Sequence, residues 1–402
     1  MMRDEFQGVA QALAGLSSRI SGARGGRTTR YVLDCIEEVR HVLCLPDISR
    51  LLNRFSEYEN TLYSIDNYRD HFLHPFHVFL LGFLVLRANE ERGTWPALKA
   101  CTLREWALTA LLHDIAYVAE KGPKWQEAFV REELKFSVGS QNDWRSLICE
   151  PDNVERVTRM AAAFVEVVGE TVRDAKGHPM DSGYSFTAWH NKQLVVHHGH
   201  AALGSLLLLK ESTAWTELGP NEVDRCALAV ALHHYSKGAD VRDPDEGKWA
   251  PPRLGKLTAD CLPLAYLLSC CDATQVWGRP VRNTNGPDYF KYVRCDRKPV
   301  DSTERLVTVA LDFDTQSADK ELKEPSASYW KAFGSKVQEE TAKMRASWGR
   351  SLANGPAFRV QCEATPNPTG LDPIDKYCCT DTPSPSSSGA PAGLEASEHG
   401  GP

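Results

Sequence analysis

The sequence predicts a mainly α-helical protein with a small C-terminal β-α-β appendage and a disordered tail. From about residue 61 to residue 290, apolar residues recur at helical spacing with few β-branched alternations. After residue 300, the alternating stretch LVTVALDFD is followed by a long amphipathic stretch and by a second alternating stretch, FRVQCEA. From about residue 364 to the end, Pro, Ser and Gly dominate, and this composition is typical of disorder.

These patterns divide the chain into four regions. We expect an N-terminal helical extension over 1–60, a helical domain over 61–290, an α/β appendage over 300–363 and a disordered tail over 364–402. The main helices of the helical domain are expected near 76–89, 101–119, 125–136, 152–168, 191–210, 221–236 and 257–274.

Two irregular stretches are expected to form long loops beside histidine-bearing helices. The first lies between Val172 and Trp189, and the second runs from Ser236 to Lys256. Both are rich in loop-forming residues and long enough to lie over a pocket. A role as lids and a role as ordinary surface insertions both remain open.

Composition and charge restrict the classes of function. The net charge of -7 and a pI near 6.0 argue against a general nucleic-acid binder, which needs a basic surface. The longest apolar stretch, VFLLGFLVL, is too short to span a bilayer, and the N-terminus does not resemble a secretory signal. The twelve cysteines include no CxxC pair, which favours reduced thiols in a cytoplasmic protein.

Histidine is concentrated in the middle of the chain. Eleven of the thirteen histidines fall between His71 and His234. His113 is followed directly by Asp114 inside the apolar run ALTALLHDIAYVA, where an ionised carboxylate is costly to bury unless a cation compensates it. A divalent metal ion would supply that compensation.

Histidine and aspartate enter from five separate apolar stretches. They are His71, His74 and His77 in RDHFLHPFHVFLLGFLVL; His113 and Asp114; His197, His198 and His200 in VVHHGHAALGSLLLL; His233 and His234 in ALHHYS; and Asp272 in LLSCCDATQVWGRP. Buried polar groups need partners, so one shared cation accounts for all five sites at once. A purely structural network of His–Asp hydrogen bonds is the alternative.

The order of these residues resembles the H…HD…H…H…D pattern of the HD-domain metal-dependent phosphohydrolase superfamily over about residues 70–280. His74 matches the first His because Val78 stands four places on, and His200 matches the third because it precedes Gly204. The His233–His234 pair is similar to the paired His of the two-metal branch of the family. The GYP signature of that branch is absent, Pro75 replaces the usual small residue after the first His, and Tyr117 stands near where many relatives place a Lys.

The resemblance implies an HD-type helical bundle and a set of metal ligands. One ion would be held by His74, His113, Asp114 and Asp272, and a second by Asp114, His200, His233 and His234. This mixture of donors suits Mn, Fe, Co, Ni or Zn and allows Mg. One or two ions are both compatible with the pattern. Within this set, Asp114, His113, His200 and His233 are expected to serve the reaction.

A phosphate substrate would need fixed positive charge near the metal. Flanking basic residues are candidates for this role, although a solvated surface position is the alternative for each: Arg69, Lys121, Lys124 and Arg279. The remaining histidines of the motif segments are expected either to support the ligands or to pack at helix surfaces: His71, His77, His197 and His198.

The sequence therefore predicts a cytoplasmic metal-dependent phosphohydrolase that acts on a nucleotide or a related small phosphorylated molecule. The alternative is a metal-stabilised domain that senses or binds a nucleotide without turnover. Neither a membrane nor nucleic acid in general is an expected partner, and the oligomeric state is not predicted.

Overall fold

The structure is a computed structural model, and its mainly helical character confirms the predicted fold class at that level. The residues that it describes are 2–20, 26–62, 68–69, 71–118, 144–173, 178–195, 199–233, Tyr235, Leu254, 257–277, 281–282, 292–295, 306–321, 326–348, 355–368 and 370–378.

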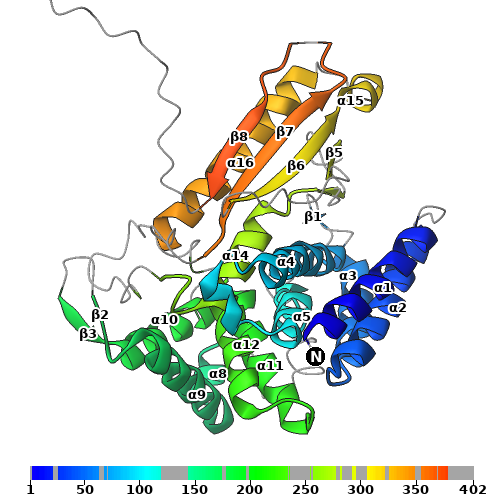
Figure 1. Cartoon of the computed structure of the whole chain (residues 1–402). Coiled ribbons are helices and arrows are strands. Elements are labelled where there is room, and N and C mark those ends of the chain that lie inside the picture. The colour runs from blue at the N-terminus through cyan, green and yellow to red at the C-terminus, as the bar shows by residue number, and fades with distance from the viewer. Residues whose placement is uncertain are drawn as a thin grey trace, which may run out of the picture.

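Helices dominate the described part of the chain up to residue 277 (Figure 1). The helices there are α1 (Met2–Ile20), α2 (Gly26–Leu43), α3 (Ser49–Leu62), α4 (Leu73–Arg92), η1 (Pro96–Ala100), α5 (Leu103–Leu112), α8 (Trp144–Cys149), α9 (Pro151–Val168), α10 (Ser182–Val195), α11 (His200–Glu211), η3 (Ser212–Ala214), α12 (Pro220–Leu232) and α14 (Pro263–Thr274). None of the described helices combines the length and the apolar character needed to span a bilayer.

Helix α5 shows how the sequence defines a central element. It begins with a capping box, in which the Glu105 amide donates to Thr102 Oγ1 and the Thr102 amide donates to Glu105 Oε2, each at 3.1 Å. Its buried Trp106 packs on α4 and donates from Nε1 to the carbonyl of Phe79. A Cβ atom at Gly82 would lie 1.9 Å from the Trp106 ring, so only glycine permits this close approach. The contact fixes α4 against α5.

The structure differs from the predicted elements at several boundaries. The helix expected over 191–210 is two helices, α10 and α11, because the helical backbone of α10 ends at Val195 and Gly199 caps a new helix. The stretch expected to be a loop between Val172 and Trp189 contains a hairpin and the first half of α10. Pro263 starts α14, later than the expected residue 257, as suits a proline at the first helical position.

Some predictions fall where the structure gives no description. The helix expected over 125–136 lies outside the described residues, and so does the loop expected over 236–256 apart from Leu254.

Short strands form two small ribbons in the helical part. Strands β2 (Thr171–Arg173) and β3 (Pro179–Asp181) make the hairpin before α10. Strands β1 (Tyr68–Arg69) and β4 (Val281–Arg282) pair antiparallel, with Tyr68 opposite Arg282 and Arg69 opposite Val281. The second ribbon ties the segment before α4 to the segment after α14.

The C-terminal part contains the predicted β-α-β unit. Strand β6 (Leu306–Asp314) pairs in parallel with β7 (Ala357–Thr365), and the crossover contains α15 (Thr315–Glu321) and α16 (Ser326–Trp348). Strand β5 (Val293–Cys295) and strand β8 (Ile374–Cys378) complete a sheet of order β5-β6-β7-β8. Strand β8 lies in the range predicted as a disordered tail; residues 379–402 lie outside the described residues.

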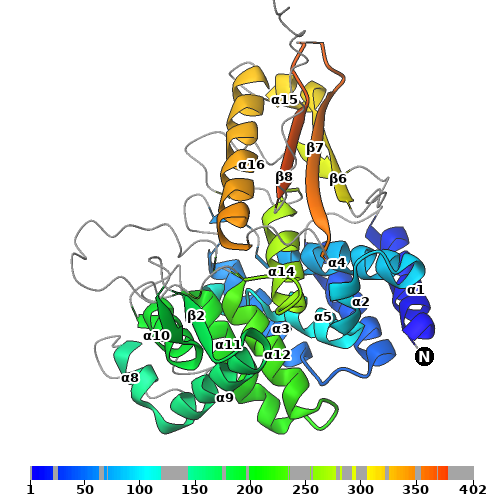
Figure 2. The same ribbon diagram turned by 60° about the vertical axis from the view of Figure 1, so that its left-hand side comes forward.

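The sheet unit packs against the helical part through α14 (Figure 2). The hydroxyl of Tyr266 on α14 donates to the carbonyl of Pro356 at 2.5 Å, and its ring meets Trp348 at a centroid distance of 5.4 Å. These contacts hold the helix that carries Asp272.

Candidate metal centre

Helix ends bring the predicted ligand residues together. His74 lies in the first turn of α4, His113 follows the last residue of α5, and His233 follows the last residue of α12. His200 is the first residue of α11, and Asp272 lies two residues before the last residue of α14. Three helices, α5, α12 and α14, end here and two, α4 and α11, begin here, so the predicted ligand residues lie where five helix ends meet.

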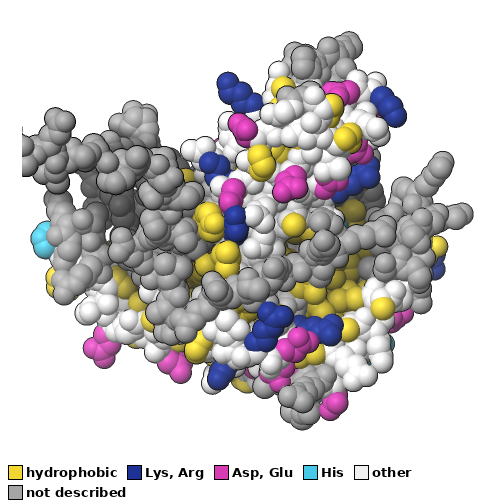
Figure 3. Space-filling view, turned by 45° about the horizontal axis from the view of Figure 1, so that its top comes forward, with side chains coloured by type: hydrophobic (Ala, Val, Ile, Leu, Met, Phe, Trp, Pro, Cys, Tyr) yellow, Lys and Arg dark blue, Asp and Glu magenta, His cyan; other side chains and the backbone are white. Residues whose placement is uncertain are grey.

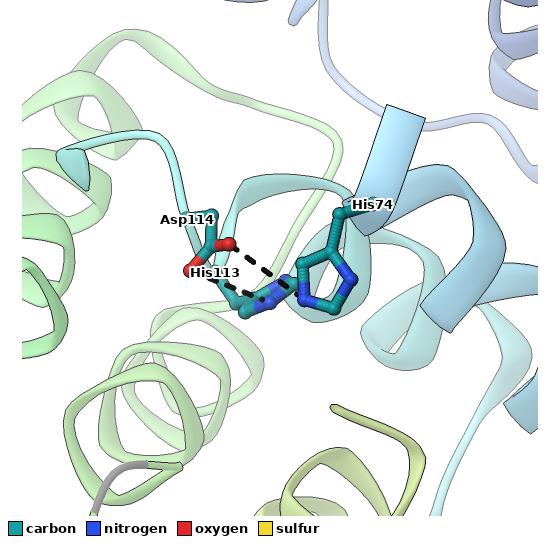
Figure 4. A group of neighbouring side chains, drawn as sticks. All are labelled: His74, His113 and Asp114. Carbon is teal, nitrogen blue, oxygen red and sulfur yellow. Dashed lines mark ion pairs between the residues drawn. The ribbon is translucent and has the colours of Figure 1, made fainter. Parts of the chain in front are cut away.

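Asp114 is at the centre of the cluster. Its Oδ1 lies 3.1 Å from His200 Nε2, 3.5 Å from His113 Nε2 and 3.8 Å from His233 Nε2. Its Oδ2 lies 3.7 Å from His74 Nε2, and Figure 4 shows His74 and His113 pointing toward this carboxylate. One carboxylate therefore faces four imidazoles.

Asp272 closes one side of the cluster. Its Oδ1 lies 2.8 Å from His74 Nε2 and 4.0 Å from His113 Nε2. Its side chain is 16% exposed, whereas that of Asp114 is 5% exposed. Solvent therefore reaches the ligand atoms more readily at Asp272 than at Asp114.

Two groups of donor atoms are close enough together to hold a metal ion. The first consists of His74, His113 and Asp114, and the second of Asp114, His200 and His233. Asp114 belongs to both groups, as the sequence predicts for a bridging carboxylate. All five side chains are buried.

The protonation states suit metal binding. Burial lowers the pKa of His113 against the opposing effect of Asp114, so the imidazole is held neutral. Burial alone would raise the pKa of Asp114, but His113, His200 and His233 outweigh it and hold the pKa of this carboxyl well below its usual value. Neutral imidazole and ionised carboxylate are the forms that bind metals.

Backbone carbonyls orient two of the imidazoles. His113 Nδ1 lies 2.8 Å from the carbonyl oxygen of Ala110, and His233 Nδ1 lies 2.6 Å from that of Val230. Because a carbonyl only accepts, each Nδ1 carries the proton, and each Nε2 presents a lone pair to the cluster. The buried Nε2 of His113 has no hydrogen-bond partner among the described residues, which a metal ion would supply.

Two polar residues that the sequence analysis did not identify form hydrogen bonds with residues at the start of α4. The buried carboxylate of Glu59, from α3, accepts from the backbone amides of His71 and Phe72. The side-chain oxygen of Gln275, just after α14, contacts His74 Nδ1. Neither residue belongs to a recognisable motif, so only their position in the fold identifies them.

His71 and His77, the two histidines on either side of His74 in the sequence, lie around the cluster. His71 stacks on Tyr117 at a centroid distance of 3.4 Å, and Tyr117 meets the edge of His200 at 5.1 Å. His77 Nδ1 lies 3.3 Å from Gln275 Nε2. His71 and His77 therefore lie behind the predicted ligand residues and contact them through Tyr117 and Gln275.

Several predicted site residues are not placed by the structure. The backbone of Arg69 lies in β1, but its side chain is outside the described part. The following residues lie wholly outside the described residues: Lys121, Lys124, His197, His198, His234 and Arg279.

Comparisons of the chain with protein-family models, curated proteins and solved structures returned no match. The buried His/Asp cluster, positioned to hold a metal ion of unknown identity, is therefore the basis for a functional inference.

Proposed function

We propose that this protein is an HD-type metal-dependent phosphohydrolase that acts on a nucleotide or a related small phosphorylated molecule. The observation that carries the proposal is the buried Asp114 carboxylate, which faces His74, His113, His200 and His233. A shared cation accounts for this arrangement better than a structural network of hydrogen bonds, because the buried His113 Nε2 makes no hydrogen bond within the described part of the chain.

The residues divide into two ligand sets that meet at Asp114. His74, His113 and Asp272 would hold one ion with it, and His200 and His233 would hold a second. A bound divalent metal supplies an activated water at neutral pH and stabilises charge on a phosphoryl oxygen. The protein would contribute the neutral imidazole of His113, the ionised carboxylate of Asp114 and a largely buried site.

Solvent can reach one side of the cluster. This favours a reaction on a molecule that binds from solvent over a purely structural metal ion. The partial exposure of Asp272 leaves one side of the donor set reachable, whereas structural metal sites are closed by protein ligands. Arg69, Lys121, Lys124 and Arg279 remain the proposed phosphate contacts. The β1–β4 ribbon brings the backbone of Arg69 close to Val281, two residues after Arg279.

The test combines metal analysis with a turnover screen on the full chain. Wild-type protein, Asp114→Ala and the control Asp224→Ala are loaded with Mn, Fe, Co, Ni, Zn or Mg and assayed on nucleotides for phosphate or nucleoside release. Asp224 lies on α12, the helix that His233 directly follows, but it pairs with Arg159 at 2.6 Å, away from the cluster.

We expect wild type and Asp224→Ala to bind metal and turn over substrate, and Asp114→Ala to lose both properties. Stoichiometric metal without turnover on the whole panel would overturn the hydrolase and support the nucleotide-sensing domain. Equal metal content in wild type and Asp114→Ala would overturn the ligand assignment.

A further inference from the structure

The side chain of Gln275 is a buried amide next to the proposed metal centre. Gln275 is the first residue after α14 and is 1% exposed. A buried amide needs hydrogen-bond partners for its oxygen and its nitrogen. The partners of Gln275 lie on both sides of the α4–α14 contact.

The contacts of Gln275 determine its orientation. Nε2 lies 2.5 Å from the backbone carbonyl of Trp277, which can only accept, so this end of the amide is the donor. Oε1 therefore faces His74 Nδ1. Since the amide oxygen only accepts, His74 donates from Nδ1.

This hydrogen bond leaves His74 Nε2 directed at the cluster. The same Nε2 is 2.8 Å from Asp272 Oδ1 and 3.7 Å from Asp114 Oδ2. His74 thus receives from Gln275 the support that His113 receives from the carbonyl of Ala110 and His233 from that of Val230. A side chain serves here because His74 lies in the first turn of its helix, where no carbonyl of a preceding helical turn is available to it.

Gln275 also contacts a second histidine of the same helix. Its Nε2 lies 3.3 Å from His77 Nδ1, one turn after His74 on α4. The His77 ring in turn lies 6.2 Å from the Trp277 ring. The three-residue spacing therefore places His74 between Asp272 and the oxygen of the Gln275 amide, and places His77 at the nitrogen of that amide.

We propose that Gln275 is a positioning residue that fixes the tautomer and ring plane of His74 for metal binding, with His77 and the Trp277 carbonyl holding the amide in place. The inference rests on the metal centre of the proposed function, and it concerns metal affinity, whatever the substrate. Loss of such an outer hydrogen bond typically lowers metal affinity about 10- to 100-fold.

Equilibrium metal binding by the full chain tests this role. The probes are Zn²⁺ alone and Mn²⁺ alone, each titrated against a competing chelator. Gln275→Leu removes the acceptor with little change of volume, Gln275→Glu keeps an acceptor, and Thr274→Val is the control. Thr274 is the buried neighbour whose hydroxyl donates only within α14, to the carbonyls of Cys270 and Cys271.

We expect Gln275→Leu to weaken metal binding about 10- to 100-fold, Gln275→Glu to recover most of that loss, and Thr274→Val to match wild type. His77→Leu should weaken binding by a smaller factor than Gln275→Leu, because the Trp277 carbonyl still holds the amide. Equal dissociation constants for Gln275→Leu and Thr274→Val would overturn the proposal.

Nitrogen NMR of the histidine rings in metal-free protein provides a second readout that does not depend on metal binding or turnover. Wild type and Thr274→Val should show a proton at His74 Nδ1. Without metal, Nε2 also faces an acceptor, Asp272 Oδ1 at 2.8 Å, so Gln275→Leu should lose the Nδ1 proton and keep a proton at Nε2. An unchanged His74 signal in folded Gln275→Leu would overturn the positioning role. If Gln275→Leu weakens metal binding but wild type turns over no nucleotide, the hydrolase proposal is rejected and the positioning role of Gln275 stands.

Discussion

The helical part and the C-terminal sheet unit both bury apolar side chains, but they differ in where their polar side chains lie. In the helical part, histidine and aspartate side chains enter the interior from the ends of five helices. In β6, by contrast, Val307, Val309, Leu311 and Phe313 are buried and the residues between them are partly exposed. Among the described residues, the groups placed to hold a metal ion all lie in the helical part.

The difference follows from the geometry of the two kinds of element. A strand sends alternate side chains to opposite faces, so polar residues of a sheet with one open face collect at the solvent. Helix ends leave backbone carbonyls unsatisfied, and these can orient a buried imidazole, as Ala110 does for His113. Buried polar side chains at helix ends thus point to function. Polar side chains on the open face of the sheet are explained by the alternation of the strand, which places them at the solvent.

The largest expected effect outside the cluster is on the core of the sheet unit. Phe313 is fully buried, with Trp330 at 5.4 Å and Tyr292 at 6.2 Å between ring centroids. Phe313→Ala should lower the free energy of unfolding by about 3–5 kcal/mol, as measured by urea denaturation. Metal stoichiometry should not change, because no ligand lies on β6.

The conservative variant Phe313→Leu should lose less stability, which separates packing from a general failure to fold. Loss of bound metal in folded Phe313→Ala would show that the sheet unit and the metal cluster are not independent. In that case the contacts of Tyr266 with Pro356 and Trp348 would be the route to α14 and Asp272.

Sequence patterns predicted the residues of the buried cluster, but not the residues that support them. His74, His113, Asp114, His200, His233 and Asp272 are polar residues in apolar surroundings, and the order in which they occur resembles a known pattern, so the sequence alone singles them out. Gln275 is an ordinary polar residue at the end of a helix. Its role depends on the contact of α14 with α4, which no local pattern encodes.

The boundaries that the sequence did not predict have similar causes. The break between α10 and α11 occurs within an apolar stretch whose periodicity continues on both sides, so Gly199 was the one local signal. Strand β8 follows a segment rich in turn residues. It is stabilised by pairing with β7, from Phe358 opposite Cys378 to Cys362 opposite Ile374. Tertiary pairing overrides composition there.

A second prediction concerns a histidine that is buried in the helical part but lies outside the metal groups. His190 is fully buried, its Nε2 lies 3.1 Å from Ser205 Oγ, and burial lowers its pKa to about 4. The unfolded chain takes up a proton at this histidine near pH 6.5, and the folded protein does so only near pH 4. The contribution of neutral His190 to the free energy of unfolding is therefore fully present above pH 6.5 and is lost as the pH falls toward 4.

The difference of about 2.5 pKa units corresponds to about 3 kcal/mol. Urea denaturation of metal-free protein between pH 7 and pH 4 should show that His190→Gln loses less stability than wild type by roughly this amount. The remaining histidines are common to both proteins, so the difference isolates His190. Parallel stability curves for wild type and His190→Gln would contradict this assignment.

The smallest expected effect lies on the open face of the sheet. Arg359 contacts Asp375 through two hydrogen bonds, at 2.8 and 2.5 Å, and both side chains are partly exposed. Figure 3 shows basic and acidic side chains interspersed on the surface of the molecule. Asp375→Asn should lower the free energy of unfolding by less than about 1 kcal/mol, because solvent and salt screen an exposed pair. The difference from wild type should shrink further between low and high salt, and metal affinity should stay the same. A loss above about 2 kcal/mol that persists in high salt would show that polar groups of this face are as tightly coupled to the fold as the buried cluster.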